Sequence, residues 1–561
     1  MEKIWLKSYP EGIPAEIDVD AYSSLRDVFE TSCRRFRDLP AYSNMGVTLS
    51  YGELDQASRN FGAYLQKGLG LQKGDRVAIM LPNLLQYPVA LFGTLRAGLT
   101  VVNVNPLYTA TELEHQLKDS GAVAIVVLEN FARTLQEVIG ATGVKTVITT
   151  QIGDMFPAAK ALLTNVVVKY VKKMVPDWRI AGTTPFNRVL QEGRDQALDP
   201  VPLTHDDIAL LQYTGGTTGV AKGAILTHGN MVANVLQLGA WIARDLLDAK
   251  ETAITPLPLY HIYALTANLV FTKIGAHNIL ITNPRDLPAF VAVLKKTRFT
   301  AMIGVNTLYN ALLHAPGFAE VDTRALKMAN AAGMAVQRVV AEQWKRVTGV
   351  SLMEAYGLTE TAPGAVGNPL NVEWTGTIGV PIPSTEAAIL DDEGNELPLG
   401  QVGEICIRGP QVMKGYWNRP EETEKAFAKG GWFRTGDMGF MNEKGFIKIT
   451  DRKKDMILVS GFNVYPNEVE DVVMMHRGVM EVAAIGAPDE KSGEVVKIVV
   501  VKKDPDLTAD ELILHCRKHL TAYKVPKIVE FRTEPLPKTP VGKVLRRLLR
   551  GEAVNKQAGA A

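Results

Sequence analysis

The sequence Tyr213-Thr214-Gly215-Gly216-Thr217-Thr218-Gly219-Val220-Ala221-Lys222-Gly223 is a loop of glycines and threonines closed by a lysine. The apolar run 208–213 leads into it and predicts a buried strand. Glycines let backbone N–H groups wrap an anion, hydroxyls donate further hydrogen bonds, and the lysine adds positive charge. The loop therefore predicts a polyphosphate site, whose expected ligands are Thr214, Gly215, Gly216, Thr217, Thr218, Gly219 and Lys222.

This loop differs from two well-known nucleotide-binding motifs. A Walker A loop needs Gly-Lys-Ser or Gly-Lys-Thr, whereas here Ala221 precedes Lys222 and Gly223 follows it. The loop is not a Gly-x-Gly-x-x-Gly dinucleotide fingerprint either. The plain alternative is a glycine-rich turn without a ligand, which several threonines among the glycines disfavour.

Length and charge exclude several classes of protein. A chain of 561 residues is too long for one ordinary core, and about 150 residues per domain predicts three or four lobes. With 61 basic and 60 acidic residues, nothing indicates a nucleic-acid partner. Cys33, Cys406 and Cys516 are far apart and form neither a metal spacing nor a disulfide framework, which fits a reducing cytoplasm.

Neither a signal peptide nor a membrane span is expected. The first ten residues are charged and lack a continuous apolar core. The best candidate span, 84–104, is interrupted by Gln86, Pro88, Arg96 and Asn103. The expected location is therefore cytoplasmic.

One segment, 160–175, predicts an amphipathic basic helix, with apolar residues on one side and lysines mostly on the other. Such a helix can lie on an anionic membrane, which would place the protein peripherally on its inner face. The commoner outcome for such a pattern is an ordinary surface helix packed on the core.

The patterns along the chain predict an α/β and α+β multidomain protein. Strand and helix patterns alternate over the first 450 residues, which argues for parallel sheets covered on both faces. From about residue 377 short strands with Gly and Pro turns predict a β-rich lobe. We expect an N-terminal domain over 1–450, a charged hinge over 451–454 and a mobile α+β domain over 455–561.

Further motifs follow the loop in a fixed order. They are Pro256–Tyr263, Ala355–Glu360, Trp432–Asp437, Asp451–Lys454, Ser460–Pro466 and Leu536–Lys543. Together with the loop they resemble the signatures of the adenylate-forming enzymes, and the chain looks closest to bacterial long-chain fatty acyl-CoA synthetases. The resemblance runs from Asp75 to Lys543 and implies the fold of that family, two α/β lobes plus a β-rich lobe and a small mobile domain.

The resemblance also implies roles for individual residues. His261 would orient the substrate carboxylate, although a lone histidine is more often structural. Glu360 and Thr214 would hold Mg²⁺, since a carboxylate beside a polyphosphate needs a bridging cation; the alternative for Glu360 is a solvated turn residue. Lys543 would be the catalytic lysine, the alternative being a surface lysine in a basic tail.

The remaining roles concern the nucleotide, the thiol and the hinge. Tyr356 would stack on adenine, and Asp437 would bind the ribose hydroxyls with its two acceptor oxygens. The other nucleotide contacts would be Ala332, Gly333, Gly357, Thr359 and Arg452. Gly461 and Phe462 would line the coenzyme A channel, while Asp451 and Lys454 would form the hinge.

We therefore expect ATP-dependent activation of medium- or long-chain fatty acids to fatty acyl-CoA through acyl-AMP, with Mg²⁺, ATP and coenzyme A. No aspartate stands near His261 to hold an amine, so an amino-acid substrate is disfavoured. The rivals are a stand-alone ligase that loads acyl-AMP onto a carrier protein, a non-catalytic lipid sensor and a luciferase-type oxygenase. A homodimer is compatible with the resemblance.

Overall fold

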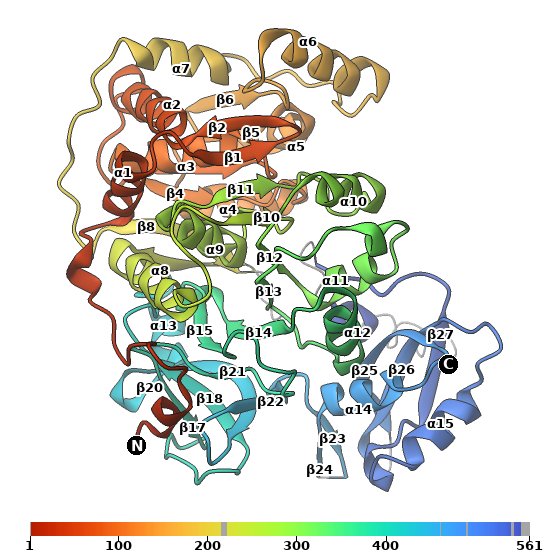
Figure 1. Ribbon diagram of the computed structural model, residues 1–561. Coiled ribbons are helices and arrows are strands. Elements are labelled where there is room, and N and C mark those ends of the chain that lie inside the picture. The colour runs from red at the N-terminus through yellow and green to blue at the C-terminus, as the bar shows by residue number, and fades with distance from the viewer. Residues whose placement is uncertain (1, 215–220, 461, 490–491, 540–543, 551–561) are drawn as a thin grey trace.

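The computed structural model describes residues 2–214, 221–460, 462–489, 492–539 and 544–550 (Figure 1). Two large sheets form most of the N-terminal part, and most of their strands run parallel, as the strand–helix alternation predicts. The first sheet consists, in spatial order, of β16 (Val380–Pro381), β15 (Gly364–Gly367), β14 (Leu352–Gly357), β13 (Met328–Ala331), β12 (Ala301–Gly304), β10 (Thr252–Thr255), β11 (His277–Leu280), β1 (Pro40–Asn44) and β2 (Val47–Ser50).

The second sheet carries the glycine-rich loop. Its strands are, in spatial order, β19 (Gly415–Tyr416), β9 (Lys222–Thr227), β8 (Ile208–Thr214), β4 (Thr100–Asn103), β3 (Arg76–Met80), β5 (Ala124–Leu128), β6 (Thr146–Thr150) and β7 (Thr184–Pro185). The predicted buried strand before the loop is confirmed as β8, whose residues 209–213 are all buried.

Helices connect and cover these strands. They are α1 (Leu25–Arg35), α2 (Tyr51–Ala63), α3 (Gln86–Arg96), α4 (Ala110–Ser120), α5 (Ala132–Val138), α6 (Ala158–Val166), α7 (Phe186–Arg194), α8 (His228–Ile242), α9 (Ile262–Lys273), α10 (Leu287–Lys296), α11 (Asn306–Leu313) and α12 (Arg338–Thr348). Helix α3 is buried along its whole length. Its Tyr87 hydroxyl lies 2.7 Å from Asn103 Oδ1 of β4 and 2.8 Å from the Leu259 carbonyl beyond β10, so α3 ties the two sheets together.

The expected β-rich lobe is confirmed. Its sheet contains β17 (Glu386–Leu390), β18 (Gly403–Arg408), β21 (Trp432–Met441), β20 (Phe427–Ala428) and β22 (Ile447–Arg452), and α13 (Pro420–Ala426) precedes β20. The last two residues of β22 are Asp451 and Arg452, so the predicted hinge begins inside a strand.

A smaller α+β unit with its own apolar core follows at lower right in Figure 1. Its elements are β23 (Ile457–Val459), β24 (Phe462–Val464), α14 (Pro466–Met474), β25 (Val479–Asp489), β26 (Gly493–Lys502), α15 (Ala509–Arg517) and β27 (Ile528–Arg532). A capping box opens α15: Thr508 accepts from the Glu511 amide, and the Glu511 side chain accepts from the Thr508 amide.

Helix α6, with the turn that follows it, contacts the main core through the partly buried side chains of Ala161 and Val168, while most of its larger apolar side chains are exposed. It continues into a π-helical turn, η6 (Val167–Val171), and no residue of either element is buried. Among the described residues, no helix is both long and apolar enough to cross a bilayer.

Candidate active site

The stem of the glycine-rich loop is an antiparallel pair, in which Thr214 ends β8 and faces Lys222 at the start of β9. Gly215, Gly216, Thr217, Thr218 and Gly219 lie outside the described residues. Both stem strands are anchored to α4: the Tyr213 hydroxyl donates to Asp119 Oδ2 at 2.7 Å, and His115 Nε2 lies 3.0 Å from the Ala221 carbonyl. The loop is therefore held at both ends by one helix.

Lys222 points toward the segment that follows β19. Its amine pairs with Glu422 and lies 5.2 Å from the centre of the Tyr416 ring. Burial lowers the pKa of Lys222, while the nearby Glu360 carboxylate opposes that shift. The lysine thus already lies among acidic and aromatic groups, positioned for exchange onto a phosphate.

Glu360 lies in the short helix η8 (Thr359–Thr361), which follows β14 and packs against β8 and β9. Its Oε1 accepts a hydrogen bond of 2.7 Å from the Tyr416 hydroxyl. Its backbone carbonyl accepts from the Met413 amide at 2.7 Å. The structure therefore brings Thr359 and Glu360 beside the loop stem, as the metal and phosphate roles require.

Tyr356, Asp437 and Arg452 form one group from three strands, in which Tyr356 and Asp437 are buried and Arg452 is partly exposed. The Tyr356 hydroxyl donates to Asp437 Oδ2 at 2.6 Å, and Arg452 Nε lies 2.8 Å from Asp437 Oδ1. Asp437 and Arg452 are direct cross-strand partners of β21 and β22. Burial raises the pKa of Tyr356, and the Asp437 charge adds to that shift. Both carboxylate oxygens of Asp437 are thus engaged within the protein.

The predicted adenine-side residues follow β13. Ala332 is mostly buried, and its amide donates to the Gly304 carbonyl at 3.4 Å. Gly333 has φ +80°, which favours glycine, and a Cβ there would meet no atom within 4 Å. Open space beside a glycine leaves room for a flat ligand.

Gly357 has a different reason to be glycine. A Cβ at this position would lie 1.8 Å from the Pro363 carbonyl oxygen, which is a severe overlap. The close approach of β14 to residues 363–364 therefore accounts for Gly357, apart from any nucleotide.

His261 caps α9 and lies in the turn after β10. Its Nδ1 accepts from the Tyr263 amide at 3.3 Å. The preceding Tyr260 carbonyl accepts from Gln212 of β8 at 2.9 Å, so this turn is tied to the loop-bearing strand. The Tyr263 hydroxyl bonds to Asn330 of β13, which places the histidine between the loop strand and the adenine-side strand.

The predicted hinge residue Asp451 is buried and contacts the small domain. Its Oδ2 accepts from the Asn467 amide in the first turn of α14 at 2.7 Å. Burial raises its pKa to about 6, against the opposing charge of Arg546. Burial also lowers the pKa of Lys454, and Arg452 adds to that shift.

Of the predicted thiol-channel residues, Phe462 is 57% exposed and stacks on Tyr523 with ring centres 4.9 Å apart. Gly461 and Lys543 lie outside the described residues. The charges of the described site residues influence one another. The Glu360 carboxylate favours the charged forms of Lys222, Arg452 and Lys454 and so raises their pKa values. Asp437 has the same effect on Arg452 and Lys454.

Sequence reasoning missed Tyr416 and Glu422. Tyr416 contacts both predicted ligands. The Lys222 amine lies over its ring, and its hydroxyl donates a hydrogen bond to Glu360. Glu422 is in the first turn of α13, behind Pro420. The available signal was the segment Gly415-Tyr-Trp-Asn-Arg-Pro-Glu-Glu422, but nothing local in it indicates contact with a loop almost 200 residues earlier.

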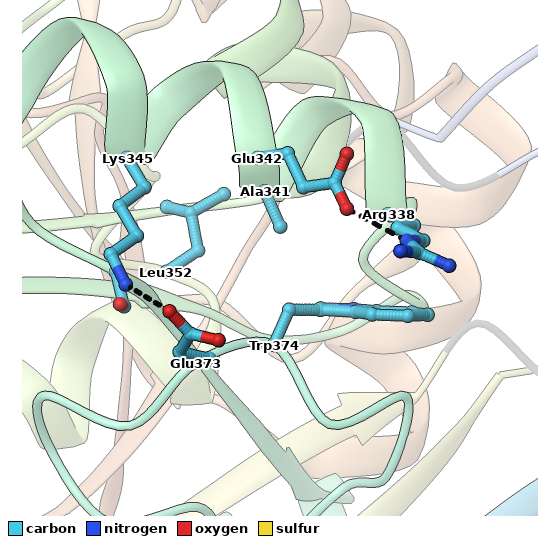
Figure 2. Close-up of a pocket in the computed structure, with 8 residues that line it drawn as sticks. Arg338, Ala341, Glu342, Lys345, Leu352, Glu373 and Trp374 are labelled. Carbon is cyan, nitrogen blue, oxygen red and sulfur yellow. Dashed lines mark hydrogen bonds and ion pairs between the residues drawn. The ribbon is translucent and has the colours of Figure 1, made fainter.

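A groove of about 450 Å³ beside α12 is distinct from this site (Figure 2). Ion pairs Lys345–Glu373 (2.8 Å) and Arg338–Glu342 (2.7 Å) lie along it. The Trp374 ring closes one side, and its indole N–H donates to the Val336 carbonyl at 3.0 Å. None of the predicted site residues lines this groove.

The fit of a divalent cation depends on the oxygen donors around Glu360. Within the described part of the chain, no cluster of three His, Cys, Asp or Glu residues could hold a metal by itself. One carboxylate and one hydroxyl, from Glu360 and Thr214, are hard oxygen donors of the kind that Mg²⁺ accepts when phosphates and water supply the rest. The residues therefore fit a metal that arrives with a nucleotide.

Comparisons with known proteins agree with this geometry. Residues 29–417 match the family described as "AMP-binding enzyme", and residues 468–543 match "AMP-binding enzyme C-terminal domain". A "Long-chain-fatty-acid--CoA ligase" of Escherichia coli O6:H1 is 57% identical over 99% of both chains, and one of Haemophilus influenzae is 54% identical over 99% of this chain and 100% of its own. ATP-bound MatB from Rhodopseudomonas palustris is similar in structure, with a TM-score of 0.80 and 28% identity over 94% of this chain and 98% of that one.

Proposed function

This chain belongs to the AMP-binding enzymes, within the long-chain-fatty-acid–CoA ligases, and from that premise we propose how its residues divide the work. The enzyme joins a long-chain fatty acid to coenzyme A at the expense of ATP. A fatty carboxylate and ATP give acyl-AMP and pyrophosphate, and acyl-AMP and coenzyme A then give acyl-CoA and AMP. The observation that supports the assignment of roles is that Glu360, which meets Lys222 at Tyr416 beside the loop stem, also acts by its charge on Arg452, which pairs with Asp437.

In the first step negative charge grows on the phosphates. Lys222 exchanges Glu422 for a phosphate oxygen, and Thr214 through Gly219 supply N–H and O–H donors. Glu360 and Thr214 hold Mg²⁺, which neutralises phosphate charge when it is bound. Thr359 binds a phosphate oxygen from the same turn as Glu360.

The nucleoside lies against residue 332 just after β13, residue 356 near the end of β14 and residue 437 within β21. Ala332 and Gly333 leave space for adenine, with Tyr356 on the other side. Asp437 accepts from the ribose hydroxyls, and this exchanges its hydrogen bond with Tyr356 for bonds to the sugar. Arg452 keeps the carboxylate oriented through its ion pair with Asp437 Oδ1.

His261 orients the fatty carboxylate toward the α-phosphate, because its turn lies between the loop strand and the adenine-side strand. We propose that medium-chain acids are also substrates. Each buried CH₂ adds about 0.8 kcal/mol of binding, so the affinity for the acid should rise with its chain length.

The second step uses the same site with a different face of the small domain. The domain, 455–561, rotates about Asp451–Lys454, removes Lys543 and brings the Gly461–Phe462 loop to the acyl carbon. The exposed ring of Phe462 supports this role, since it is available for contact. Asp451, bonded to the first turn of α14, couples the end of β22 to the small domain in the present arrangement.

The test separates the two half-reactions. Lys543→Ala should lose acyl-AMP formation from acid and ATP by about 10² to 10³ or more, because a preorganised positive group is lost. It should keep most thioester formation from ready-made acyl-AMP and coenzyme A. Pyrophosphate release measures the first, thiol consumption measures the second, and Lys518→Ala at an exposed position of the same domain is the control.

Equal damage to both half-reactions would contradict the rotation. A ligase that loads a separate carrier protein would instead leave free coenzyme A unacylated in the second assay. We also propose peripheral contact of this enzyme with the membrane and keep a homodimer as a proposal that analytical ultracentrifugation tests.

A further inference from the structure

Helix α6 and its continuation η6 expose a row of large apolar side chains at the periphery of the molecule, at upper right in Figure 1. The exposed fractions are 69% for Leu162, 65% for Leu163, 40% for Val166, 68% for Tyr170, 70% for Val171 and 52% for Met174. We call these six side chains the α6 face. A contiguous exposed apolar surface of this kind indicates an interaction site.

The helix is attached by a narrow side, on which Ala161 and Val168 pack against the main core and two polar side chains bond to neighbouring segments. Asn165 Oδ1 accepts from the Gly153 amide at 2.8 Å. Lys169 pairs with Glu129 Oε2 at 3.6 Å, and the Glu129 side chain is only 6% exposed. These contacts fix the rotation of the helix about its axis, so the α6 face has to point outward.

A second element adds to this surface. The tip between β1 and β2 carries Met45, which is 50% exposed. The Lys160 amine donates to the Met45 carbonyl, so the tip lies against α6. Two segments more than 100 residues apart therefore present apolar side chains at one place.

The charged side chains of the segment that carries the α6 face are all basic. Residues 157–176 contain four lysines and no acidic residue. Lys172 and Lys173, at the end of η6, are both exposed. Each basic residue near an anionic membrane contributes about 1 kcal/mol of attraction.

We propose that the α6 face is the surface by which this enzyme lies on a bilayer containing anionic lipid, with its apolar side chains inserted at the headgroup boundary. This deepens the proposed membrane contact by assigning the surface and the lipid charge. A second copy of the chain fits less well. A helix of 14 residues is about 21 Å long and about 10 Å wide, which gives a face of roughly 200 Å², against about 800 Å² per partner in stable interfaces. A long-chain acid also partitions into the same bilayer, so contact shortens its path to the site.

The experiment measures co-sedimentation of the full chain with vesicles of phosphatidylcholine, with and without phosphatidylglycerol. The parent should bind the anionic vesicles and bind the neutral ones less. Leu162→Ser with Tyr170→Ser and Val171→Ser should weaken binding to anionic vesicles by at least about tenfold. The matched control is Leu247→Ser with Val339→Ser and Leu514→Ser, three side chains of similar exposure (54%, 59% and 56%) on other elements, and it should bind like the parent.

The charge is tested separately by Lys172→Gln with Lys173→Gln, which should lower binding to anionic vesicles and leave binding to neutral ones unchanged. This pair also keeps the proposal falsifiable if the triple serine variant fails to fold. No binding by the parent, or unchanged binding by both variants, overturns the proposal. A change of oligomeric state in the triple variant without a change in vesicle binding assigns the face to a second copy instead.

Failure of the membrane surface is distinguishable from failure of the enzyme. Pyrophosphate release with a water-soluble medium-chain acid, measured without vesicles, should be the same for the parent and the triple variant. If the triple variant loses this activity, the substitutions have damaged the enzyme, and the Lys172→Gln with Lys173→Gln variant then decides the membrane proposal.

Discussion

At the scale of single residues, Glu360 carries the sharpest expectation. Glu360→Gln should raise the Mg²⁺ concentration for half-maximal adenylation by about tenfold or more, because an amide oxygen is a poorer ligand for a hard cation. A magnesium titration of pyrophosphate release measures it. Tyr416→Phe is the matched control: it removes the 2.7 Å hydrogen bond to Glu360 but keeps the carboxylate, so its shift should be smaller. If Glu360→Gln needs the same Mg²⁺ concentration as the parent for half-maximal pyrophosphate release, Glu360 does not bind the metal.

At the scale of elements, the turn that leaves β14 sets the position of Thr359 and Glu360. Gly357→Ala would drive a Cβ to 1.8 Å from the Pro363 carbonyl, so β14 and residues 363–364 would have to separate. We expect a loss of about 2–4 kcal/mol of stability, a typical cost of severe overpacking. Activity should fall further, since the turn carries Glu360, the proposed metal ligand. Urea unfolding and pyrophosphate release measure the two effects.

The control for this turn is Gly333→Ala, where φ is +80° but a Cβ would meet nothing within 4 Å. Its cost should be only about 1 kcal/mol of backbone strain. Equal destabilisation by the two variants would mean that the contact with Pro363 does not constrain β14.

At the scale of the whole molecule, the two domains bring carboxyl groups together. Burial raises the pKa of Glu354 in β14 to about 8, and Asp471 of α14 adds to that shift across the domain boundary. Burial likewise raises the pKa of Asp471 to about 6, which Asp451 and Glu468 reinforce and Lys448 opposes. The present arrangement of the domains therefore favours protonated carboxyl groups.

The sign of the resulting pH dependence follows from these shifts. A carboxyl group whose pKa is higher in the folded state binds its proton more tightly there, so its contribution is fully present below its ordinary pKa and is lost as pH rises through the folded value. We therefore expect the melting temperature to fall as pH rises from about 4.5 to about 8, the ordinary and folded pKa values of Glu354. Glu354→Gln should be more stable than the parent at pH 9, by on the order of 1–3 kcal/mol, and should differ little at pH 5.

Thermal unfolding across this pH range measures the effect. Glu342→Gln, at a carboxylate that pairs with Arg338 on nearby α12, is the control and should follow the parent curve. A Glu354→Gln curve parallel to that of the parent would show that Glu354 does not titrate in this range.

Much of the fold was predictable because its signals are local. The strand before the glycine-rich loop, the capping box at Thr508 and the change of texture after residue 377 all depend on neighbouring residues. The motif order likewise pointed to the family and to the reaction that the relatives support. Periodicity also identified an amphipathic helix near 160–175, since both sides of a helix are visible in the sequence.

What tertiary structure alone decided is how distant residues meet. The bond from Tyr356 to Asp437 spans 81 residues, and Tyr416 reaches Glu360 across 56, so no local pattern contains either contact. The periodicity of α6 could not say which side faces the protein. Packing of Ala161 and Val168 on the core and the polar contacts of Asn165 and Lys169 decide it. Sequence determined which residues this site has available, and the packing of sheets and lobes determined their partners, because pairing depends on which strand ends the fold brings together.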